Sequence, residues 1–165
     1  MNASLSLCVL DHGLLLGACP RSPEHVDELV SVYEVDTIVN LQTDGDFEGL
    51  GLRWDLMWQH IVSRGIDVVR VPIEDLNERS MKQGMDQAVA VVTERLRSGE
   101  RVYLHCTAGI NRSSTVAAAV LAGPFEMGFL RSMEHISSRR RVAPYLGLVQ
   151  RWLEANYPSY SDSEI

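Results

Sequence analysis

Short runs of β-branched and apolar residues alternate along this chain with longer stretches in which apolar residues recur at helical spacing. The clearest strand-like runs are 37–41, 67–73 and 101–105, and a long helical stripe at 81–96 lies between the last two. Strands separated by helices build βαβ units, in which a mostly parallel sheet is covered by helices on both faces. The alternation therefore predicts an α/β fold of three layers, with a twisted, mostly parallel sheet in the middle.

Local signals predict the boundaries of several further elements. Residues 5–10 and 14–19 are apolar and flank an Asp-His-Gly turn, which indicates a hairpin or two edge strands. Ser22 and Pro23 favour the start of a helix. The polar, glycine-rich segment 42–51 is typical of a loop.

The second half of the chain is predicted to be mainly helical. Ser80 and Gln83 have the spacing of a capping box at the start of the long helix. Further helices are predicted at 113–121, 127–138 and 144–157 from the spacing of their apolar residues.

The size and composition of the chain are those of one globular domain. With 165 residues we expect a single catalytic domain at 1–157 and a polar, disordered tail at 158–165. Hydrophobic residues make up 45% and charged residues 22%, which excludes a disordered chain. The net charge of −7 argues against binding to nucleic acid or to an anionic membrane. No apolar run approaches the ~20 residues of a membrane span.

The cysteines, Cys8, Cys19 and Cys106, are odd in number and widely spaced, with no Cys-x-x-Cys pair. This pattern argues against a disulfide framework and against a cysteine-rich zinc site. The first residues lack the basic segment of a signal peptide. We therefore expect a protein of the cytoplasm, in which Cys8 and Cys19 are buried thiols. The sequence does not indicate an oligomeric state.

One segment, 106–113, reads Cys-Thr-Ala-Gly-Ile-Asn-Arg-Ser and connects the strand-like run 101–105 to a helix of small residues. A strand that leads through a short loop into a helix N-terminus can turn several backbone N–H groups around one anion. We predict that a phosphate group is bound there by Thr107, Ala108, Gly109, Ile110, Asn111 and Arg112.

The same segment carries a candidate nucleophile. The positive end of the helix favours the thiolate form of Cys106. Arg112 offers a planar, two-pronged donor to phosphate oxygens, and Ser113 can hydrogen-bond the sulfur and help to expel it. These residues predict phosphoryl transfer to sulfur and hydrolysis of the cysteinyl phosphate, without a metal ion or cofactor. A cysteine that merely fills the core is disfavoured by the spacing to Arg112, and we expect His105 to shape the loop rather than to react.

Hydrolysis also requires an acid that protonates the leaving oxygen. Asp75 is the best candidate, because it follows the strand-like run 67–73 and so should reach the same edge of the sheet as Cys106. Its alternative role is that of a turn or capping residue, and Glu74 is the second choice for the acid.

The combination of His105, Cys106, Arg112 and Ser113 with Asp75 upstream resembles the signature of the dual-specificity phosphatase family. The resemblance extends over about 14–157. It implies that Cys106 is the nucleophile, Arg112 the phosphate clamp and Asp75 the general acid and base.

Within that family, residues 17–21, 24–26 and 40–46 resemble the segment ahead of the catalytic core in glucan phosphatases, the laforin and plant starch phosphatase type. This resemblance implies phosphate monoesters on a glycogen- or starch-like glucan as the substrate.

Other positions differ from the glucan phosphatase pattern. Asn111 stands where those enzymes usually carry glycine, and Ser113 follows the arginine as in protein-directed members of the family. Gly49, Leu50 and Leu76 take the places of aromatic residues that line the sugar channel of plant members. A phosphoprotein or a phosphoinositide is therefore the alternative substrate. A third alternative, a phosphate-binding module without activity, is disfavoured by the presence of the nucleophile, the arginine and the acid.

Aromatic and basic residues outside the motif have two interpretations. The spacing of Trp54 and Trp58 predicts that both face the core, and the alternative is an exposed ring on which a sugar stacks. Of Phe125 and Phe129, we expect Phe125 to be the more exposed. The basic run 139–141 either neutralises a helix C-terminus or, by the resemblance, provides an arginine that attracts phosphate groups to the rim of the active site.

Overall fold

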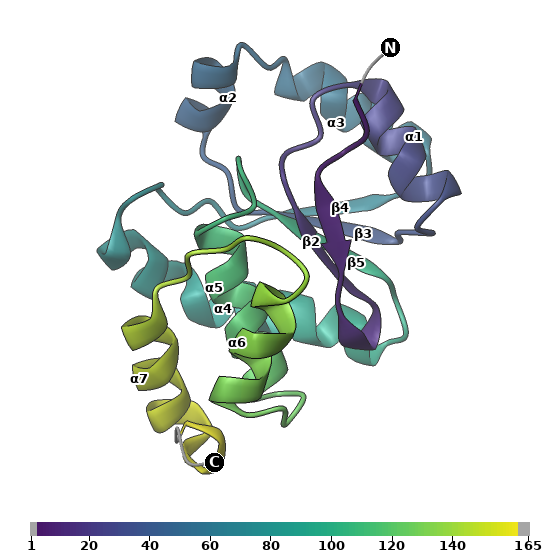
Figure 1. Ribbon diagram of the computed structural model, residues 1–165. Coiled ribbons are helices and arrows are strands. Elements are labelled where there is room, and N and C mark those ends of the chain that lie inside the picture. Colours follow the sequence, from purple (N-terminus) through teal and green to yellow (C-terminus); the bar gives the residue numbers. More distant parts are fainter. Residues whose placement is uncertain (1–2, 162–165) are drawn as a thin grey trace.

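The computed structural model describes residues 3–161, and within them a five-stranded sheet lies between two layers of helices (Figure 1). The strands stand in the order β1-β2-β5-β3-β4. Their bounds are Leu7–Val9 for β1, Leu14–Gly17 for β2, Thr37–Asn40 for β3, Asp67–Arg70 for β4 and Val102–His105 for β5.

The sheet is mostly parallel, as the sequence predicts. Only β1 runs antiparallel, and it forms the predicted hairpin with β2 across the short 3-10 helix Asp11–Gly13. Strand β5 occupies the centre, where β2 and β3 flank it in parallel register. The carboxyl ends of these three strands therefore meet at one edge of the sheet.

Helices cover both faces of the sheet (Figure 1). One face carries α1 (Pro23–Ser31) and α3 (Trp54–Ser63), and the other carries α4 (Glu78–Arg97), α5 (Arg112–Ala122), α6 (Phe129–Ser137) and α7 (Leu146–Asn156). Helix α1 begins as predicted, because the Ser22 side chain accepts a hydrogen bond from the His25 N–H and Pro23 is the first helical residue. Helices α5, α6 and α7 begin and end within two residues of the predicted ranges.

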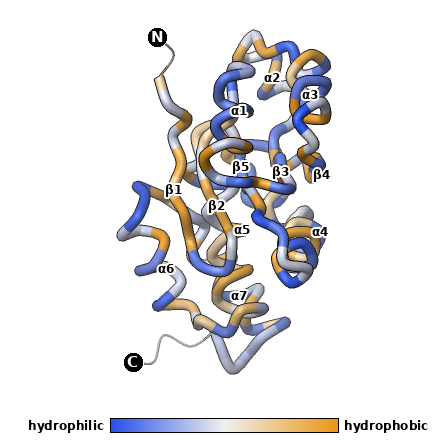
Figure 2. Tube along the Cα trace, turned by 90° about the vertical axis from the view of Figure 1, so that its right-hand side faces the viewer, coloured by the Kyte–Doolittle hydropathy of each residue, from blue (hydrophilic) through white to orange (hydrophobic). Residues whose placement is uncertain are grey.

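The two faces of the sheet bury two hydrophobic clusters. Because successive side chains of a strand point to opposite faces, Leu15 and Ile38 pack with side chains of α1 and α3, whereas Leu16 and Val39 pack with those of α4 to α7. Figure 2 shows hydrophobic residues along the strands and hydrophilic ones mostly on the surrounding helices and turns. Every residue of α5 is buried, so its small side chains let α4, α6 and α7 pack closely around it.

Two of the predicted element boundaries are wrong. Within 42–51, predicted to be a loop, the structure has helix α2 (Asp44–Leu50), which Thr43 and Asp46 start with a reciprocal capping box. The capping box predicted for Ser80 and Gln83 does not form. Ser80 Oγ instead accepts a hydrogen bond from the Glu74 N–H at 2.9 Å. Helix α4 begins earlier than predicted and is capped by the Asn77 side chain.

The prediction of a disordered tail is wrong for the first four residues of that tail. Pro158–Tyr160 form a 3-10 helix, and Ser161 after it is buried. Residues 162–165 lie outside the described residues. Among the helices of 3–161, none is long and apolar enough to cross a membrane.

Gly17 at the end of β2 is a point of close packing that can be tested. A Cβ atom there would lie closer than 3.0 Å to atoms of Ser6, Leu7 and Tyr103. We expect Gly17→Ala to lower the free energy of unfolding by about 1–3 kcal/mol, since overpacking forces the backbone to shift. Urea unfolding at neutral pH would measure the change.

Gly49→Ala is the matched control, because a Cβ atom there meets nothing within 4 Å. Gly49 lies inside α2, where alanine is the better helix former. The control should be neutral or stabilising. Equal stability of the Gly17 variant and the wild type would show that β2 can move away from β1 and β5 without a loss of folding free energy.

Candidate active site

The loop 106–111 leaves the carboxyl end of the central strand β5 and ends where α5 begins at Arg112. Cys106, only 3% exposed, is the first residue after the strand. The structure thus has the strand, loop and helix N-terminus that the motif predicts.

All carbonyl oxygens of the loop accept hydrogen bonds from groups outside the loop. Each carbonyl from Cys106 to Asn111 accepts at least one hydrogen bond. The donors, in order along the loop, are His105 Nδ1 (2.9 Å), Cys19 N (3.0 Å), Arg140 Nη2 (2.8 Å), Arg140 Nε (2.9 Å), Ala143 N (2.8 Å) and Thr115 N (3.0 Å).

The N–H groups of the loop are free. In a trans peptide the C=O and N–H bonds point in opposite directions, and the chain has no cis peptide among its described residues. Carbonyls that are bonded on the outside therefore direct the following N–H groups to the inside. No N–H of residues 107–112 forms a hydrogen bond with another described residue. Six donors thus line a cup that suits a tetrahedral oxyanion.

Gly109 allows this loop to sit against the end of β2. Its φ of +68° lies in the left-handed region, and a Cβ atom would collide with the backbone of Gly17 and Ala18. Glycine is thus required at 109 both by its conformation and by close packing.

The base of the cup holds the predicted nucleophile. Cys106 Sγ lies 3.2 Å from Ser113 Oγ, as expected for a hydroxyl that stabilises a thiolate leaving group. His105 is fully buried and donates from Nδ1 to the Cys106 carbonyl. Burial, together with the Arg112 charge, lowers the pKa of His105 to about 4 although this hydrogen bond opposes it. His105 is thus neutral at pH 7 and shapes the loop.

Arg112 is 1% exposed and is paired with Asp46, which the sequence analysis did not single out. Its Nη1 and Nη2 atoms lie 2.7 and 3.1 Å from the two oxygens of Asp46, and Nη1 also donates to the Ile73 carbonyl at 2.9 Å. Burial disfavours the charge of Arg112, but the hydrogen bonds to Asp46 and the charges of Cys106 and Asp46 raise its pKa above the usual value.

The pairing changes what Arg112 offers to phosphate. The sequence predicts a two-pronged contact with phosphate oxygens, whereas in this structure the two prongs hold Asp46. The Nε–H group is buried and has no hydrogen bond to a described residue. It is therefore the donor of this guanidinium that a ligand can take up.

Asp75 lies at the mouth of the cup. Its Oδ1 atom is 3.3 Å from Arg112 Nε, and its side chain is 49% exposed. Glu74, the second choice for the acid, instead accepts a hydrogen bond from Asn77 Nδ2 at 2.7 Å, beside the start of α4. The placement favours Asp75 as the group that can reach a leaving oxygen.

The aromatic residues differ in part from the prediction. Trp54 is partly buried and stacks on Phe47 with ring centroids 4.8 Å apart, and Arg70 lies over Phe47 at 4.9 Å. Trp58 is 47% exposed, so the prediction that it faces the core is wrong. Phe125 stacks on the His12 ring and is partly buried, whereas Phe129 is buried, so Phe125 is the more exposed of the two as predicted.

The other two cysteines are buried thiols, as predicted. Burial raises the pKa of Cys8, and it raises that of Cys19 to about 11. Neither thiol competes with Cys106 for the role of nucleophile.

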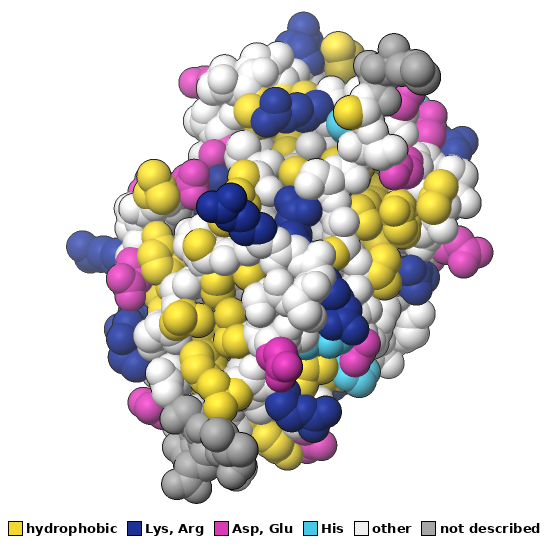
Figure 3. All heavy atoms as spheres, viewed as in Figure 1, with side chains coloured by type: hydrophobic (Ala, Val, Ile, Leu, Met, Phe, Trp, Pro, Cys, Tyr) yellow, Lys and Arg dark blue, Asp and Glu magenta, His cyan; other side chains and the backbone are white. Residues whose placement is uncertain are grey.

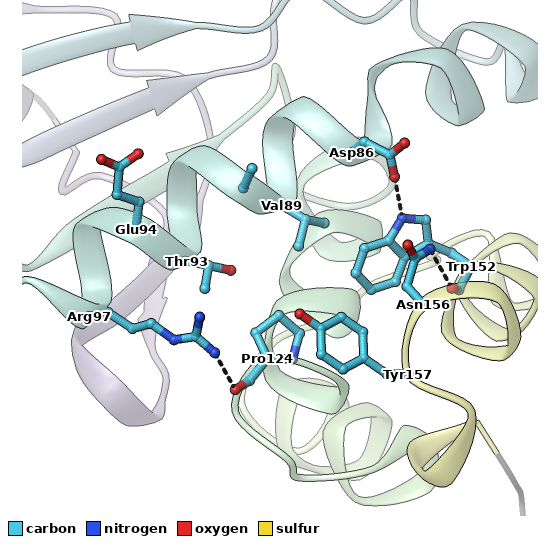
Figure 4. A pocket seen from close by; sticks show the side chains of 10 residues that line it. Asp86, Val89, Thr93, Glu94, Arg97, Pro124, Trp152, Asn156 and Tyr157 are labelled. Carbon is cyan, nitrogen blue, oxygen red and sulfur yellow. Dashed lines mark hydrogen bonds between the residues drawn. The ribbon is translucent and has the colours of Figure 1, made fainter.

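The face of the molecule drawn in Figure 3 has no broad positive patch. On the face drawn in Figure 3, basic, acidic and hydrophobic side chains are interspersed. A cavity of about 560 Å³ lies elsewhere, between α4, α7 and the turn after α5 (Figure 4). Residues that line this cavity form hydrogen bonds with one another: the Trp152 indole donates to Asp86, and Arg97 donates to the Pro124 carbonyl.

Comparison with known proteins tests the family that the motif predicts. The catalytic domain of dual specificity phosphatases matches residues 16–155. The chain belongs to this family. The family predicted from the Cys106 motif is thereby confirmed, and the fold is that of solved dual-specificity phosphatase relatives.

Three relatives illustrate the similarity. Laforin of Mus musculus is 29% identical over 142 residues, covering 79% of this chain and 42% of laforin. Phosphoglucan phosphatase DSP4, amyloplastic, of Castanea sativa is 27% identical over 139 residues, covering 83% of this chain and 37% of that protein. The crystal structure of PTPMT1 in complex with PI(5)P shares the fold, with a TM-score of 0.72 and 20% identity over 90% of this chain and 95% of that one. The chain spans about two-fifths of the length of the two curated relatives.

The ion pair of Asp46 predicts a pH-dependent effect on stability. Burial opposes the charge of Asp46, but the hydrogen bonds from Arg112 and Thr43 lower its pKa in the folded protein. Such a group stabilises the fold fully above its unfolded pKa, and this contribution is lost as the pH falls through the lowered folded pKa. We expect Asp46→Asn to cost about 1–3 kcal/mol at pH 7, and the cost should shrink below about pH 4.

Chemical denaturation at pH 7 and pH 3 would measure this difference. Asp44→Asn is the control, because Asp44 lies in the same helix but is 85% exposed. A cost of Asp46→Asn that stays constant between the two pH values would show that Asp46 does not hold Arg112 through its charge.

Proposed function

We propose that this chain hydrolyses phosphate monoesters on a phosphorylated, glycogen- or starch-like glucan through a cysteinyl-phosphate intermediate. The observation that carries the chemistry is the cup of six free N–H groups with Cys106 Sγ at its base and a buried Arg112 at its side. The glucan is the finer part of the proposal and is supported by the relatives and by the segment 40–46.

In the first step, Sγ of Cys106 attacks phosphorus and the bond to the sugar oxygen breaks. The loop N–H groups and Arg112 Nε–H stabilise the equatorial oxygens, which carry the developing charge. Asp75 gives its proton to the leaving sugar oxygen, so that an alcohol rather than an alkoxide departs.

In the second step, a water molecule attacks the phosphorus of the cysteinyl phosphate. Asp75, now ionised, takes a proton from this water, and the sulfur leaves as a thiolate. The hydroxyl of Ser113, 3.2 Å from Sγ, stabilises that thiolate. The products are the dephosphorylated sugar and inorganic phosphate, and the enzyme returns to its starting state.

The segment that resembles glucan phosphatases lies directly at the cup, which supports a glucan as the substrate. Asp46 holds Arg112, and Gln42 Nε2 donates to Thr107 Oγ1 at 3.0 Å. Arg70 connects this segment to the stacked pair of Phe47 and Trp54, since its Nη2 donates to the Gln42 carbonyl at 2.9 Å. Trp54 is partly exposed and provides an aromatic surface beside the site, of the kind on which sugar rings stack.

A phosphoinositide or a phosphoprotein is the second candidate substrate. Two apolar side chains near the cup support it, because Leu76 next to Asp75 is 85% exposed and Ile110 in the loop is 40% exposed. Such side chains suit a substrate with apolar groups next to its phosphate. We further propose a cytoplasmic location, since all three cysteines are unpaired thiols.

Substrate class can be decided by comparing three phosphate donors. We expect the chain to release phosphate from phosphorylated amylopectin faster than from a phosphopeptide or from vesicles that contain PI(5)P, at equal phosphate concentration. Cys106→Ser is the control, and we expect it to remove turnover while inorganic phosphate still binds, because the loop N–H groups remain.

Each outcome of this comparison is informative. Release from the peptide or the vesicles alone would reject the glucan and leave the phosphatase chemistry intact. Full turnover by Cys106→Ser would remove the sulfur from the mechanism.

The role of Asp75 predicts a dependence on the leaving group. We expect Asp75→Ala to lower kcat by about 10²–10⁴-fold on sugar phosphates, whose alkoxides leave poorly without a proton. On aryl phosphates, whose leaving groups are stable as anions, the loss should be much smaller. Steady-state rates on both classes would test this, with Glu74→Ala as the control. Equal losses of Asp75→Ala on the two classes would assign the acid to another residue.

A further inference from the structure

Arg140, in the segment between α6 and α7, donates two hydrogen bonds to the outside of the loop 106–111 and a third to Ser6. Its Nη2 donates to the Ala108 carbonyl at 2.8 Å, its Nε to the Gly109 carbonyl at 2.9 Å and its Nη1 to Ser6 Oγ at 2.9 Å. We propose that Arg140 is a positioning residue, which sets the direction of two loop N–H groups and thereby the affinity of the cup for phosphate. This inference rests on the proposed phosphate-binding role of the loop.

The argument follows from the geometry of the peptide group. The Ala108 carbonyl belongs to the same peptide as the Gly109 N–H, and the Gly109 carbonyl to the same peptide as the Ile110 N–H. Because each peptide is planar and trans, a donor that fixes the carbonyl on the outside also fixes the N–H on the inside. Arg140 therefore orients two adjacent donors of the cup at once.

The neighbouring carbonyls of the loop accept hydrogen bonds from other donors, so Arg140 orients only the carbonyls of residues 108 and 109. The Thr107 carbonyl accepts a hydrogen bond from the backbone N–H of Cys19. The carbonyls of Ile110 and Asn111 accept hydrogen bonds from the backbone N–H groups of Ala143 and Thr115, respectively. For the carbonyls of residues 108 and 109, the guanidinium of Arg140 is the donor among the described residues.

These two peptides also flank the most adaptable residue of the loop. Gly109 has a φ of +68°, and a glycine can rotate its peptide groups at small cost. Without an external donor, the carbonyls on either side could turn inward and oppose an anion. The fork of a guanidinium prevents this, because its planar donors bind two acceptors in fixed directions.

Arg140 is itself held in place from the N-terminal segment. Ser6 accepts from Arg140 Nη1 through its hydroxyl, and its carbonyl accepts from the Ala18 N–H at 2.9 Å. The guanidinium is thus fixed between Ser6 and the loop, on the side away from the free N–H groups. This placement separates Arg140 from Arg112, which lies beside the sulfur.

The rest of the basic run is placed differently. Arg139 donates to the His135 carbonyl and to Ser138 Oγ, within its own helix end, as the prediction of cations at a helix C-terminus requires. Arg141 is exposed. The three arginines therefore provide both a test residue and controls of equal charge.

The experiment uses the full chain and measures the binding of inorganic phosphate by calorimetry, together with kcat and KM on an aryl phosphate. We expect Arg140→Met to weaken phosphate binding at least tenfold and to lower kcat/KM, with a small change in melting temperature. Arg140→Lys should still bind phosphate severalfold more weakly than the wild type, because an ammonium group lacks the planar, forked donors of a guanidinium. Arg141→Met removes the same charge and should stay within twofold of the wild type.

Three results would overturn the inference. If Arg140→Lys restored full affinity, Arg140 would act through its charge alone. If Arg140→Met changed only the melting temperature, its role would be structural. If the wild type bound no phosphate, the cup itself would be wrong. A wild type that binds phosphate but hydrolyses no ester would instead reject the proposed function while the Arg140 comparison remained decisive.

Discussion

The site depends on how the backbone carbonyls of one loop find their hydrogen-bond donors. Six consecutive carbonyls around Cys106 all find them on the outside of the loop, from His105, Cys19, Arg140, Ala143 and Thr115. The N–H groups are then left to face inward, where they have no partner among the described residues. The proposed affinity for an oxyanion is thus a consequence of the hydrogen bonds that the outside of the loop accepts.

This dependence explains why so much of the fold is needed for one short loop. The donors come from the end of β2, from the segment between α6 and α7, and from the first turn of α5. The central position of β5 brings these elements together, because β2 and β3 flank it and α5 returns beneath it. The two glycines that meet, Gly17 and Gly109, allow the contact between β2 and the loop to be close.

The parts of the site that are local in sequence could be predicted, and the distant parts could not. The strand, loop and helix around Cys106 follow from a continuous segment, and Asp75 follows from the rule that parallel strands end at one edge. Asp46 was missed because its role is a contact with Arg112, 66 residues away. The glycines at 45, 49 and 51 also suggested a loop, although Thr43 and Asp46 have the spacing of a capping box. Trp58 was misplaced because helical spacing shows which residues share a face, but not whether that face is covered.

Under the proposed function, the pairing of Arg112 with Asp46 also explains how an acidic protein binds a phosphate dianion. A buried guanidinium is costly unless it is paired, and Asp46 provides that pairing through the two terminal nitrogens. The charge of Arg112 is then largely compensated before a ligand arrives, and its Nε–H, 3.3 Å from Asp75 Oδ1, forms no hydrogen bond with a described residue. The remaining attraction comes from peptide dipoles and from the N-terminus of α5, which need no net positive charge. The proposed recognition of phosphate by a chain with a net charge of −7 therefore depends on the direction of its backbone rather than on an excess of basic residues.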